Sequence, residues 1–370
     1  MREFGIIARV KRDPTPAGSQ FYYIEDMITM GKEWPIKVYI FSPTNWLAGE
    51  ETIKCFEYVD NTWCSSIRKI PTIIYDRYIS KTAEEEERKN TFLSYLTKNG
   101  HNFSTPLQLV DIVKDKLKFH NFLSKNKIPS IAGLKLKQAT EADLNTLIKS
   151  NQAVFIKPIQ GSGGKGIAVL IKSNDEFVLK TFDDKVIIPR NEVLAQLKAR
   201  FNPERYFIQA KAQLIAYENA PYDIRVLVQN NGKSDYQITG LALRLGQKHS
   251  WVSNLNSGGR GIALAEMNAY FQRNFNKTTD EITQDISELC LNCCAALTHE
   301  YGDFIEIAFD ILLTKDLGAI IIEANTKPAR WIFNTIADNY KEGTSEHKLY
   351  KSIRQKTVVF PLIFATNQNF

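Results

Sequence analysis

The chain has 370 residues, of which 44% are hydrophobic and 24% are charged. That length suits two or three domains with several buried cores, and that composition is typical of an ordinary globular protein. The net charge of +6 comes without a dense run of lysine and arginine, so the sequence gives no reason to expect a surface for nucleic acid or membrane.

Residues 1–10 lack the apolar core of a secretory signal, and no apolar run approaches the roughly 20 residues that span a bilayer. The five cysteines are an odd number, and three of them crowd together at Cys290, Cys293 and Cys294. We therefore expect no disulfide framework and a protein of the reducing cytoplasm. The clustered cysteines follow helical spacing, which predicts core packing rather than a zinc site.

The first 112 residues alternate short apolar runs with helical stretches. The runs are Gly5–Val10, Ile36–Ser42 and Thr72–Tyr75. This alternation predicts a small α/β domain with a parallel sheet. Beyond it we expect helices over 115–126, 141–149 and 280–301, with strand pairs and glycine turns between the last two.

A glycine loop lies between two apolar segments. Ala153–Ile159 predicts a strand with Lys157 near its end, residues 160–166 read QGSGGKG, and Ile167–Ile171 is apolar again. A Rossmann loop needs a helix after the glycines, and a Walker A loop needs Ser or Thr after the lysine; neither is present. The kinase catalytic motifs are missing too. A strand–loop–strand flap whose backbone N–H groups close over phosphate oxygens fits best; the alternative is a flexible surface hairpin.

A second constellation lies near the C-terminus, where apolar residues alternate with Glu306 and Asp310 along 305–311. A period of two places both carboxylates on one face of a strand. A turn at 315–318 and an apolar return segment, 319–325, predict an antiparallel partner strand.

The pairing of these two strands follows from the turn. If Thr314 pairs with Ala319 across the four-residue turn, Asp310 lies directly opposite Glu323. Facing carboxylates repel each other, but a bound divalent cation reverses that effect, and Mg²⁺ prefers hard oxygen ligands. Asn325 adds a neutral oxygen two residues on. The alternative is a coincidental pair with one side chain facing solvent.

Together these motifs make the chain resemble the ATP-grasp superfamily, and within it the YheC/YheD-type proteins associated with the endospore coat. The resemblance runs over essentially the whole chain. The segments that carry it are Pro71–Arg77, Phe155–Pro158 with the glycine loop, Tyr222–Val228, Ser253–Gly259 and Glu323–Pro328.

The resemblance implies an α/β fold in which a small N-terminal pre-ATP-grasp domain with a parallel sheet precedes a two-lobed ATP-grasp clamp. We assign residues 1–112 to the pre-ATP-grasp domain, 113–208 to the small lobe with the flap, and 209–370 to the large lobe with the acidic hairpin. The implied cofactors are ATP and Mg²⁺.

The resemblance also implies roles for single residues. It assigns two lysines to the phosphates, the glycine loop to a lid over them, and residues 209–213 to a hinge whose backbone reads adenine. The expected nucleotide-binding residues are Lys116, Lys157, Gly161, Ser162, Gly163, Gly164, Gln209, Ala210, Lys211 and Gln213.

The remaining roles are metal binding and charge stabilisation. Asp310, Glu323 and Asn325 match the Mg²⁺ ligands. Arg225 and Arg244 match cations near the γ-phosphate and the acylphosphate, and Arg260 resembles a cation on the substrate side. For each arginine the alternative is a surface salt bridge.

We therefore expect an ADP-forming carbon–nitrogen ligase that joins a small-molecule or peptide carboxylate to an amine through an acylphosphate. The alternative is a nucleotide-binding structural protein of the spore coat with little turnover, and phosphotransfer to another acceptor stays open. Homodimer formation and spore-coat association are further expectations from the resemblance. The sequence names neither substrate.

Overall fold

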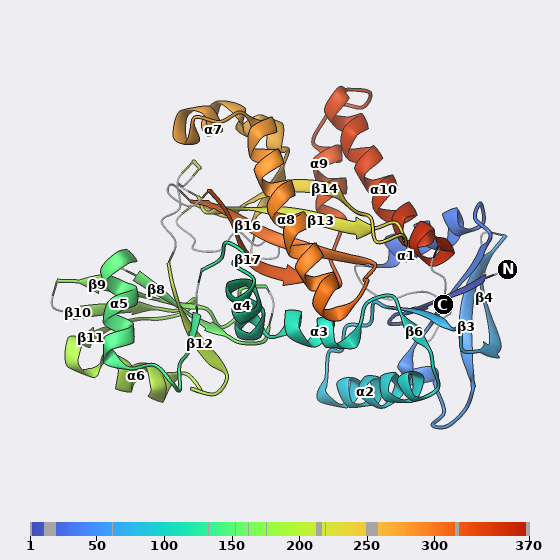
Figure 1. Ribbon diagram of the computed structural model, residues 1–370, viewed down its shortest axis with the longest axis horizontal. Helices are drawn as coiled ribbons and strands as arrows, with labels where there is room; N and C mark the ends of the chain where they lie inside the picture. The colour runs from blue at the N-terminus through green and yellow to red at the C-terminus, as the bar shows by residue number, and fades with distance from the viewer. Residues whose placement is uncertain are drawn as a thin grey trace.

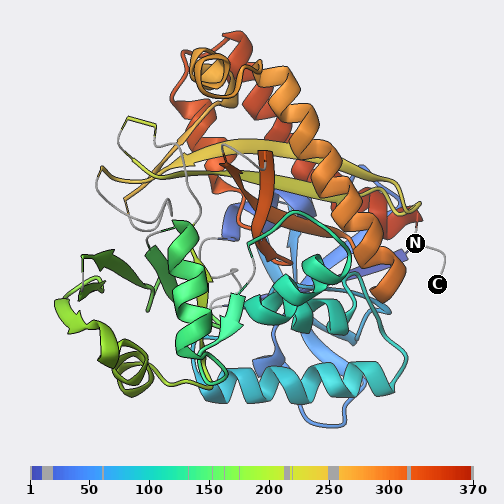
Figure 2. The same cartoon turned by 60° about the vertical axis from the view of Figure 1, so that its left-hand side comes forward.

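A computed structural model describes residues 2–10, 20–60, 62–131, 133–151, 153–161, 163–174, 176–211, 217–218, 220–248, 258–314 and 318–367. Its strands form three sheets, each in a separate body, and the bodies follow one another along the chain (Figures 1 and 2). No helix within these ranges has the length and apolar character needed to cross a membrane.

The first body contains a sheet with strand order β4-β3-β2-β1-β5-β6. Its strands are β1 (Arg2–Ile7), β2 (Ile36–Phe41), β3 (Thr52–Val59), β4 (Thr62–Lys69), β5 (Ile73–Asp76) and β6 (Asn102–Phe103). Strand β1 is parallel to β2 and β5, and β5 is parallel to β6, as the alternating apolar runs predicted. The antiparallel hairpin of β3 and β4 was not predicted. Its turn holds Asp60 at a φ of 48°, a conformation that Asp and Asn tolerate.

Helices cover both faces of this sheet. They are α1 (Phe21–Gly31), α2 (Ala83–Lys98), the short 3-10 helix η1 (Pro43–Asn45) and, from the far end of the chain, α10 (Ser345–Asn367). Helix α1 and the last part of α10 share one apolar core with β1 and β2, whereas α2 packs in a core on the other face. Figure 1 shows α10 in red reaching the blue first body.

The second body, which we call the small lobe, contains an antiparallel sheet in the order β11-β10-β9-β8-β12-β7. Its elements are β7 (Gly133–Lys135), α5 (Glu141–Asn151), β8 (Ala153–Pro158), β9 (Ala168–Ser173), β10 (Glu176–Lys180), β11 (Lys185–Pro189), η2 (Arg190–Glu192), α6 (Val193–Arg200) and β12 (Tyr206–Ala210). Helices α5 and α6 close its apolar core. The strand β9 that follows the glycine loop confirms a strand–loop–strand hairpin.

The third body, the large lobe, is built on an antiparallel sheet in the order β15-β14-β13-β16-β17. Its strands are β13 (Tyr222–Asn230), β14 (Tyr236–Leu245), β15 (Arg260–Ile262), β16 (Glu306–Thr314) and β17 (Gly318–Asn325). The helices against it are α3 (Leu107–Lys114), α4 (Lys116–Lys125), η4 (Leu264–Met267), α7 (Asn268–Phe275), α8 (Thr279–Tyr301) and α9 (Trp331–Asp338). The capping box of Thr278 and Glu281 starts α8, as its sequence indicates.

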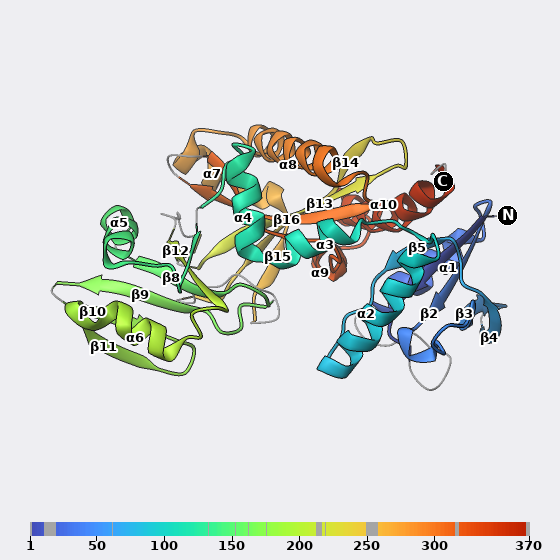
Figure 3. The ribbon, with the colours of Figure 1, turned by 60° about the horizontal axis from the view of Figure 1, so that its bottom comes forward.

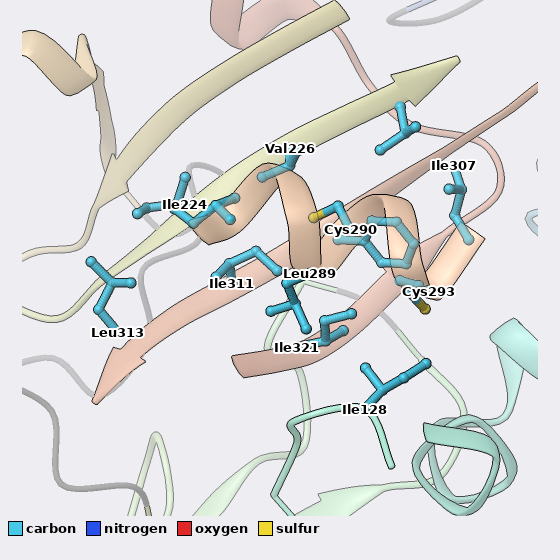
Figure 4. Close-up of a cluster of buried hydrophobic side chains, with 14 of the residues drawn as sticks. Ile128, Ile224, Val226, Leu289, Cys290, Cys293, Ile307, Ile311, Leu313 and Ile321 are labelled. Carbon is cyan, nitrogen blue, oxygen red and sulfur yellow. The ribbon is translucent and has the colours of Figure 1, made fainter. Parts of the chain in front are cut away.

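The two faces of this sheet differ in chemistry. Helix α8 packs on one face, where Cys290 and Cys293 are buried among Ile224, Ile311 and other apolar side chains (Figure 4). Burial raises the pKa of the cysteine thiols, which fits the predicted packing role. Helix α9 lies on the opposite side (Figure 3). The alternate side chains on that side include the acidic and basic residues discussed below, and we call it the charged face.

The pairing of β16 with β17 differs from the prediction beside the turn and agrees with it at the acidic residues. Thr314 pairs with Gly318 rather than with Ala319. The register then shifts by one residue, and Asp310 lies opposite Glu323. The predicted pairing of the two carboxylates is therefore confirmed, although the turn proposed for it is one residue too long.

A β-bulge accounts for the shift. It lies between Asp310 and Ile311 on β16 and leaves Ile322 as an extra residue on β17. Because of it, Ile321 is fully buried against α8, whereas Glu323 takes the charged face. A strict alternation of side chains along 319–325 predicts Ile321, Glu323 and Asn325 on one face. That prediction is wrong for Ile321, because the bulge reverses the alternation between Ile321 and Glu323.

The segment around α4 joins the two lobes. Phe119 and Phe122 of α4 pack in the α8 core of the large lobe, and the backbone N–H of Ile321 donates to the carbonyl of Pro129 at 3.0 Å. Strand β7 then enters the sheet of the small lobe. We propose the same three domains as before, with α3 and α4 lying on the large lobe and the end of α10 completing the first domain.

A buried ionic cluster holds the first body to the large lobe. The carboxylate of Glu306 is fully buried and accepts from Arg77 Nη1 at 2.9 Å, from Arg330 Nη2 and from Tyr75 OH. Arg330 also stacks on Tyr23, with 3.8 Å from guanidinium carbon to ring centroid. Arg77 and Tyr75 come from the first body, so this cluster crosses the boundary between two sheets.

We expect Glu306→Gln to lower the free energy of unfolding by about 3–5 kcal/mol, because it leaves two buried guanidinium groups without their carboxylate. Urea denaturation would measure the change. The matched control is Glu300→Gln, which removes a surface pair whose lysine side chain is 69% exposed, and it should cost less than about 1 kcal/mol. Equal effects of the two substitutions would contradict the interpretation.

Candidate functional site

The register of the large sheet brings four charged side chains together on the charged face. Asp223 lies opposite Arg244 across β13 and β14, and Arg225 lies opposite Asp310 across β13 and β16. Side chains that face each other directly across antiparallel strands are close neighbours. The backbone pairing alone therefore creates an alternating array of carboxylates and guanidinium groups.

Asp310 is the centre of this array. Arg225 donates to both of its oxygens, at 2.6 Å from Nε and 3.2 Å from Nη2. Arg244 contacts Asp310 Oδ2 at 2.7 Å and uses its Nε for Asp223 at 2.6 Å. The predicted cations Arg225 and Arg244 are thus both held on one predicted metal ligand, and their forked geometry suits carboxylate and phosphoryl oxygens alike.

Burial and charge act in opposite directions on this cluster. Burial alone would raise the pKa of the Asp310 carboxyl, but Arg225 and Arg244 outweigh it and hold that pKa below its ordinary value. For Arg244, burial works against the charged form, and Asp223 and Asp310 together raise its pKa above the usual value. Asp310 and Arg244 are therefore both charged at neutral pH.

Glu323 and Lys116 connect this array to the flap. Lys116 Nζ lies 3.2 Å from Glu323 Oε1 and 2.6 Å from the carbonyl oxygen of Gly161, the first residue of the glycine loop. The backbone N–H of Lys116 donates to Ile159 at 3.0 Å. The start of α4 therefore contacts the large lobe and the flap at once.

The flap has the backbone that its glycines suggest. Gly161, Gly163, Gly164 and Gly166 have φ values of 135°, 75°, 73° and 74°. A side chain would be strained at these angles, so glycine is required for this loop conformation. Ser162, the remaining predicted flap residue, lies outside the described residues.

Lys157 lies near the end of β8, in the small lobe. Its ammonium donates to Gln209 Oε1 at 2.7 Å and lies 4.8 Å from the centre of the Phe155 ring. Burial lowers the pKa of Lys157 to about 8, against an opposing effect of Glu323 and together with the like charge of Lys116. Lys116 thus contacts Glu323, and Lys157 lies close enough to Glu323 for its charge to act on the ammonium. The role of the two lysines in binding phosphate stays a prediction.

The donor set of the acidic hairpin suits Mg²⁺. Asp310 and Glu323 supply carboxylate oxygens, and Asn325 supplies an amide oxygen, which here accepts from the backbone N–H of Lys327 at 2.8 Å. Among the residues described, no group of three or more His, Cys, Asp or Glu side chains could hold a metal ion. A magnesium site would thus depend on these three residues together with ligands from substrate and water.

The other predicted residues divide into two groups. Gln209 and Ala210 lie within β12, and the backbone N–H of Lys211 donates to Ala153 at 3.2 Å, while Gln213 lies outside the described residues. Arg260 lies opposite Leu245, on the α8 side of the sheet, and its ion pair at 3.3 Å is with Glu218. Its side chain is 62% exposed, so the structure does not join it to the charged array, and its role stays a prediction.

Sequence reasoning missed two residues of this site. Asp223 precedes Arg225 by two positions, and that spacing on a strand could have indicated a shared face. His120 lies one turn after Lys116 on α4 and contacts Gln209 Nε2 at 3.0 Å. No local pattern signals that contact, because it joins residues from separate segments.

Comparison with known proteins agrees with this geometry. A sequence model described as YheC/D like ATP-grasp matches residues 109–353, which is more than half of the chain. The chain belongs to the YheC/D-like ATP-grasp family. The resemblance inferred from its motifs is confirmed.

Two relatives and one solved structure extend the comparison. The chain is 26% identical to the endospore coat-associated protein YheD of Bacillus subtilis over 310 residues, 78% of this chain and 63% of YheD. It is 22% identical to YheC of the same organism over 329 residues, 86% of this chain and 88% of YheC. The match thus spans slightly less than two thirds of YheD.

The solved structure is D-alanyl-alanine synthetase A from Vibrio cholerae, with a TM-score of 0.54 and 13% identity over 97% of this chain and 98% of that one. At this identity the likeness shows a shared fold. It covers the first body as well as both lobes, so the predicted ATP-grasp architecture with an N-terminal domain is confirmed.

Replacing Asp310 by Asn should lower the free energy of unfolding of the ligand-free protein by about 2–3 kcal/mol, because the buried Arg244 and the half-buried Arg225 lose a charged acceptor. Chemical denaturation is the measurement. Asp338→Asn serves as control, since its partner Lys351 is on the surface with 40% of its side chain exposed. An Asp310 variant as stable as the wild type would mean that these ion pairs do not hold the site together.

Proposed function

We propose that the protein is an ADP-forming ligase that uses Mg-ATP to join a carboxylate to an amine. One observation carries the proposal. The arginines Arg225 and Arg244 and the carboxylates Asp310 and Glu323 share one face of a sheet, and Lys116 joins that face to a glycine flap. This arrangement supplies cations for a triphosphate, oxygens for a divalent metal and a lid.

In the proposed reaction an oxygen of the substrate carboxylate attacks the γ-phosphorus of ATP. The bond from that phosphorus to the β,γ-bridging oxygen breaks, and ADP leaves. The amine nitrogen then attacks the acyl carbon, the bond to the phosphate oxygen breaks, and the amine loses a proton. The products are an amide, ADP and phosphate, and no covalent bond to the protein is needed.

The chain's residues would position and stabilise rather than react. Lys116 and Lys157 would contact phosphate oxygens as point charges, and the flap would exclude water above them. Arg225 and Arg244 would bind the transferred phosphoryl group through the donors that now hold Asp310. Both arginines would stabilise the negative charge that develops on the phosphoryl group during its transfer.

Asp310, Glu323 and Asn325 would hold Mg²⁺ when Mg-ATP is bound. A magnesium ion in this position would neutralise charge on the phosphates and align them. The residues present fit this task, since the two carboxylates and the amide oxygen lie on neighbouring positions of one strand pair.

A second candidate function is a nucleotide-binding structural protein of the spore coat with little turnover. The relatives YheD and YheC favour it, since both are endospore coat-associated proteins. The charged groups that ligation needs are nevertheless present together, which favours turnover. Adding carboxylate and amine substrates to the purified protein distinguishes the two functions, because only the ligase would then release ADP.

The test is ADP release from Mg-ATP with mixtures of amino acids and peptides as carboxylates and amines. We expect release that depends on both substrates, and Glu323→Gln should reduce it by at least about 100-fold, the scale of losing one electrostatic stabiliser of a transition state. Glu300→Gln on the surface of α8 is the matched control. Absence of ADP release with every mixture, while Mg-ATP still binds, would exclude the ligase and favour the structural protein.

Affinity for Mg-ATP should fall as the pH rises through about 8, because burial lowers the pKa of Lys157 to about 8 and only the protonated form attracts phosphate. The decline should approach about tenfold per pH unit until the pKa of the nucleotide-bound form is reached. Isothermal titration calorimetry between pH 7 and pH 9 measures it. Lys157→Arg, which stays charged throughout, should show a flat profile; a flat wild-type profile would contradict the role of Lys157.

A further inference from the structure

The ammonium of Lys157 ends a hydrogen-bond chain inside the protein. The proposed reaction does not itself use this chain. The ammonium donates to Gln209 Oε1 at 2.7 Å. On the other side of the same amide, Gln209 Nε2 lies 2.7 Å from the carbonyl oxygen of Ile131 and 3.0 Å from His120 Nε2. The Gln209 side chain is therefore in contact with three polar groups from three segments.

These three contacts permit one orientation of the Gln209 amide. Its NH₂ group has two hydrogens, and the carbonyl of Ile131 can only accept one of them. The ammonium of Lys157 can only donate, so the amide oxygen must face it. Turning the amide over would place NH₂ against an ammonium and oxygen against a carbonyl, which loses both bonds and adds repulsion.

The same chain fixes the state of His120. Since the second amide hydrogen points at Nε2, that nitrogen must accept, and the imidazole must be neutral with its proton on Nδ1. The groups acting on His120 are Lys157 on β8, Lys116 on its own helix and the carbonyl of Ile322 on β17. Burial, together with the two lysine charges, lowers the pKa of His120 to about 4, so the ring stays neutral at physiological pH.

Helix α4 connects this hydrogen-bond chain to the large lobe. Lys116 and His120 are four residues apart on α4 and thus lie on one side of it. Lys116 contacts the flap and Glu323 directly, and His120 reaches Lys157 through Gln209. One helix, packed in the core of the large lobe, therefore sets the position of both lysines, although Lys157 belongs to the small lobe.

We infer that His120 and Gln209 are positioning residues, which hold the ammonium of Lys157 at the proposed nucleotide site by presenting it with an oriented amide oxygen. This inference rests on the proposed function, in which Lys157 binds a phosphate of ATP. Neither residue need touch the substrate. Gln209, expected from the resemblance to read adenine through its backbone, acts here through its side chain.

The test uses a matched pair of substitutions at His120. His120→Gln places an acceptor where Nε2 now lies, and His120→Phe fills similar space beside Phe207 without an acceptor. Because the imidazole is neutral, neither change alters charge. Gln209→Leu, which removes the amide itself, is a second route to the same loss.

The first measurement is the titration of Lys157 in the ligand-free full chain, by competitive acetylation followed by peptide mass spectrometry. The charged groups that act on it are Glu323 on β17 and Lys116 on α4, and the variants leave both unchanged. We expect the midpoint to fall by about one pH unit in Gln209→Leu, the scale of one hydrogen bond to a charged group. His120→Phe should lower it by about half a unit, because it keeps the Gln209 amide and removes one of the groups that hold it. His120→Gln should keep it within about 0.3 unit, and combining His120→Phe with Gln209→Leu in one double variant should add nothing further.

The second measurement is Mg-ATP affinity by calorimetry at pH 7. His120→Phe should weaken it about 3- to 10-fold, and His120→Gln should stay within about twofold. An unchanged Lys157 midpoint in both His120→Phe and Gln209→Leu would overturn the inference, as would equal shifts in the two His120 variants. If the wild type binds no Mg-ATP, the proposed function fails, and the acetylation midpoints still decide this inference.

Discussion

The pairing of β16 with β17 is the constraint on which the rest of the site depends. Asp310 and Glu323 face each other because one extra residue, Ile322, interrupts the alternation of β17. Without that bulge, either the two carboxylates would lie on different faces or Ile321 would leave the core. A single irregularity in one edge strand thus satisfies both the apolar packing against α8 and the chemistry of the charged face.

Among the described residues, the charges at and beside that face do not balance. Lys116, Lys157, Arg225 and Arg244 face three carboxylates, those of Asp223, Asp310 and Glu323. Buried cations are costly unless they are paired, and the pairing here joins the proposed phosphate-binding residues to the proposed metal ligands. A nucleotide and its metal would enter as a pair of opposite charges, and the existing ion pairs could exchange partners without leaving any charge isolated.

The features predicted from sequence are those written in short stretches of chain. The alternation around Asp310, the glycines of the flap and the capping box of Thr278 each involve neighbouring residues, and periodicity or turn chemistry expresses them. The family motifs also allowed roles to be predicted for single lysines and arginines. The α/β class, the flap hairpin and the facing carboxylates could therefore be predicted from the sequence.

The rest depends on contacts between distant segments. The bulge at Ile322 follows from packing on both faces of β17, which no local pattern reports. Glu306 gains its partners from the first body and from the loop before α9, and Gln209 gains His120 from α4. Such groups look like ordinary polar residues in the sequence, since their roles exist only once three sheets are assembled.

The path of α10 has a consequence for how the protein is made. Val358 and Leu362 complete the apolar core that β1, β2 and α1 begin. At about 5–20 residues per second, the ribosome needs roughly a quarter of a minute to a minute to reach them after finishing the strands of that first sheet. During this interval α1 alone covers the apolar face that α10 later completes, so the packing of the first body can finish only after the two lobes have been synthesised. Chaperones have a defined surface to protect until then.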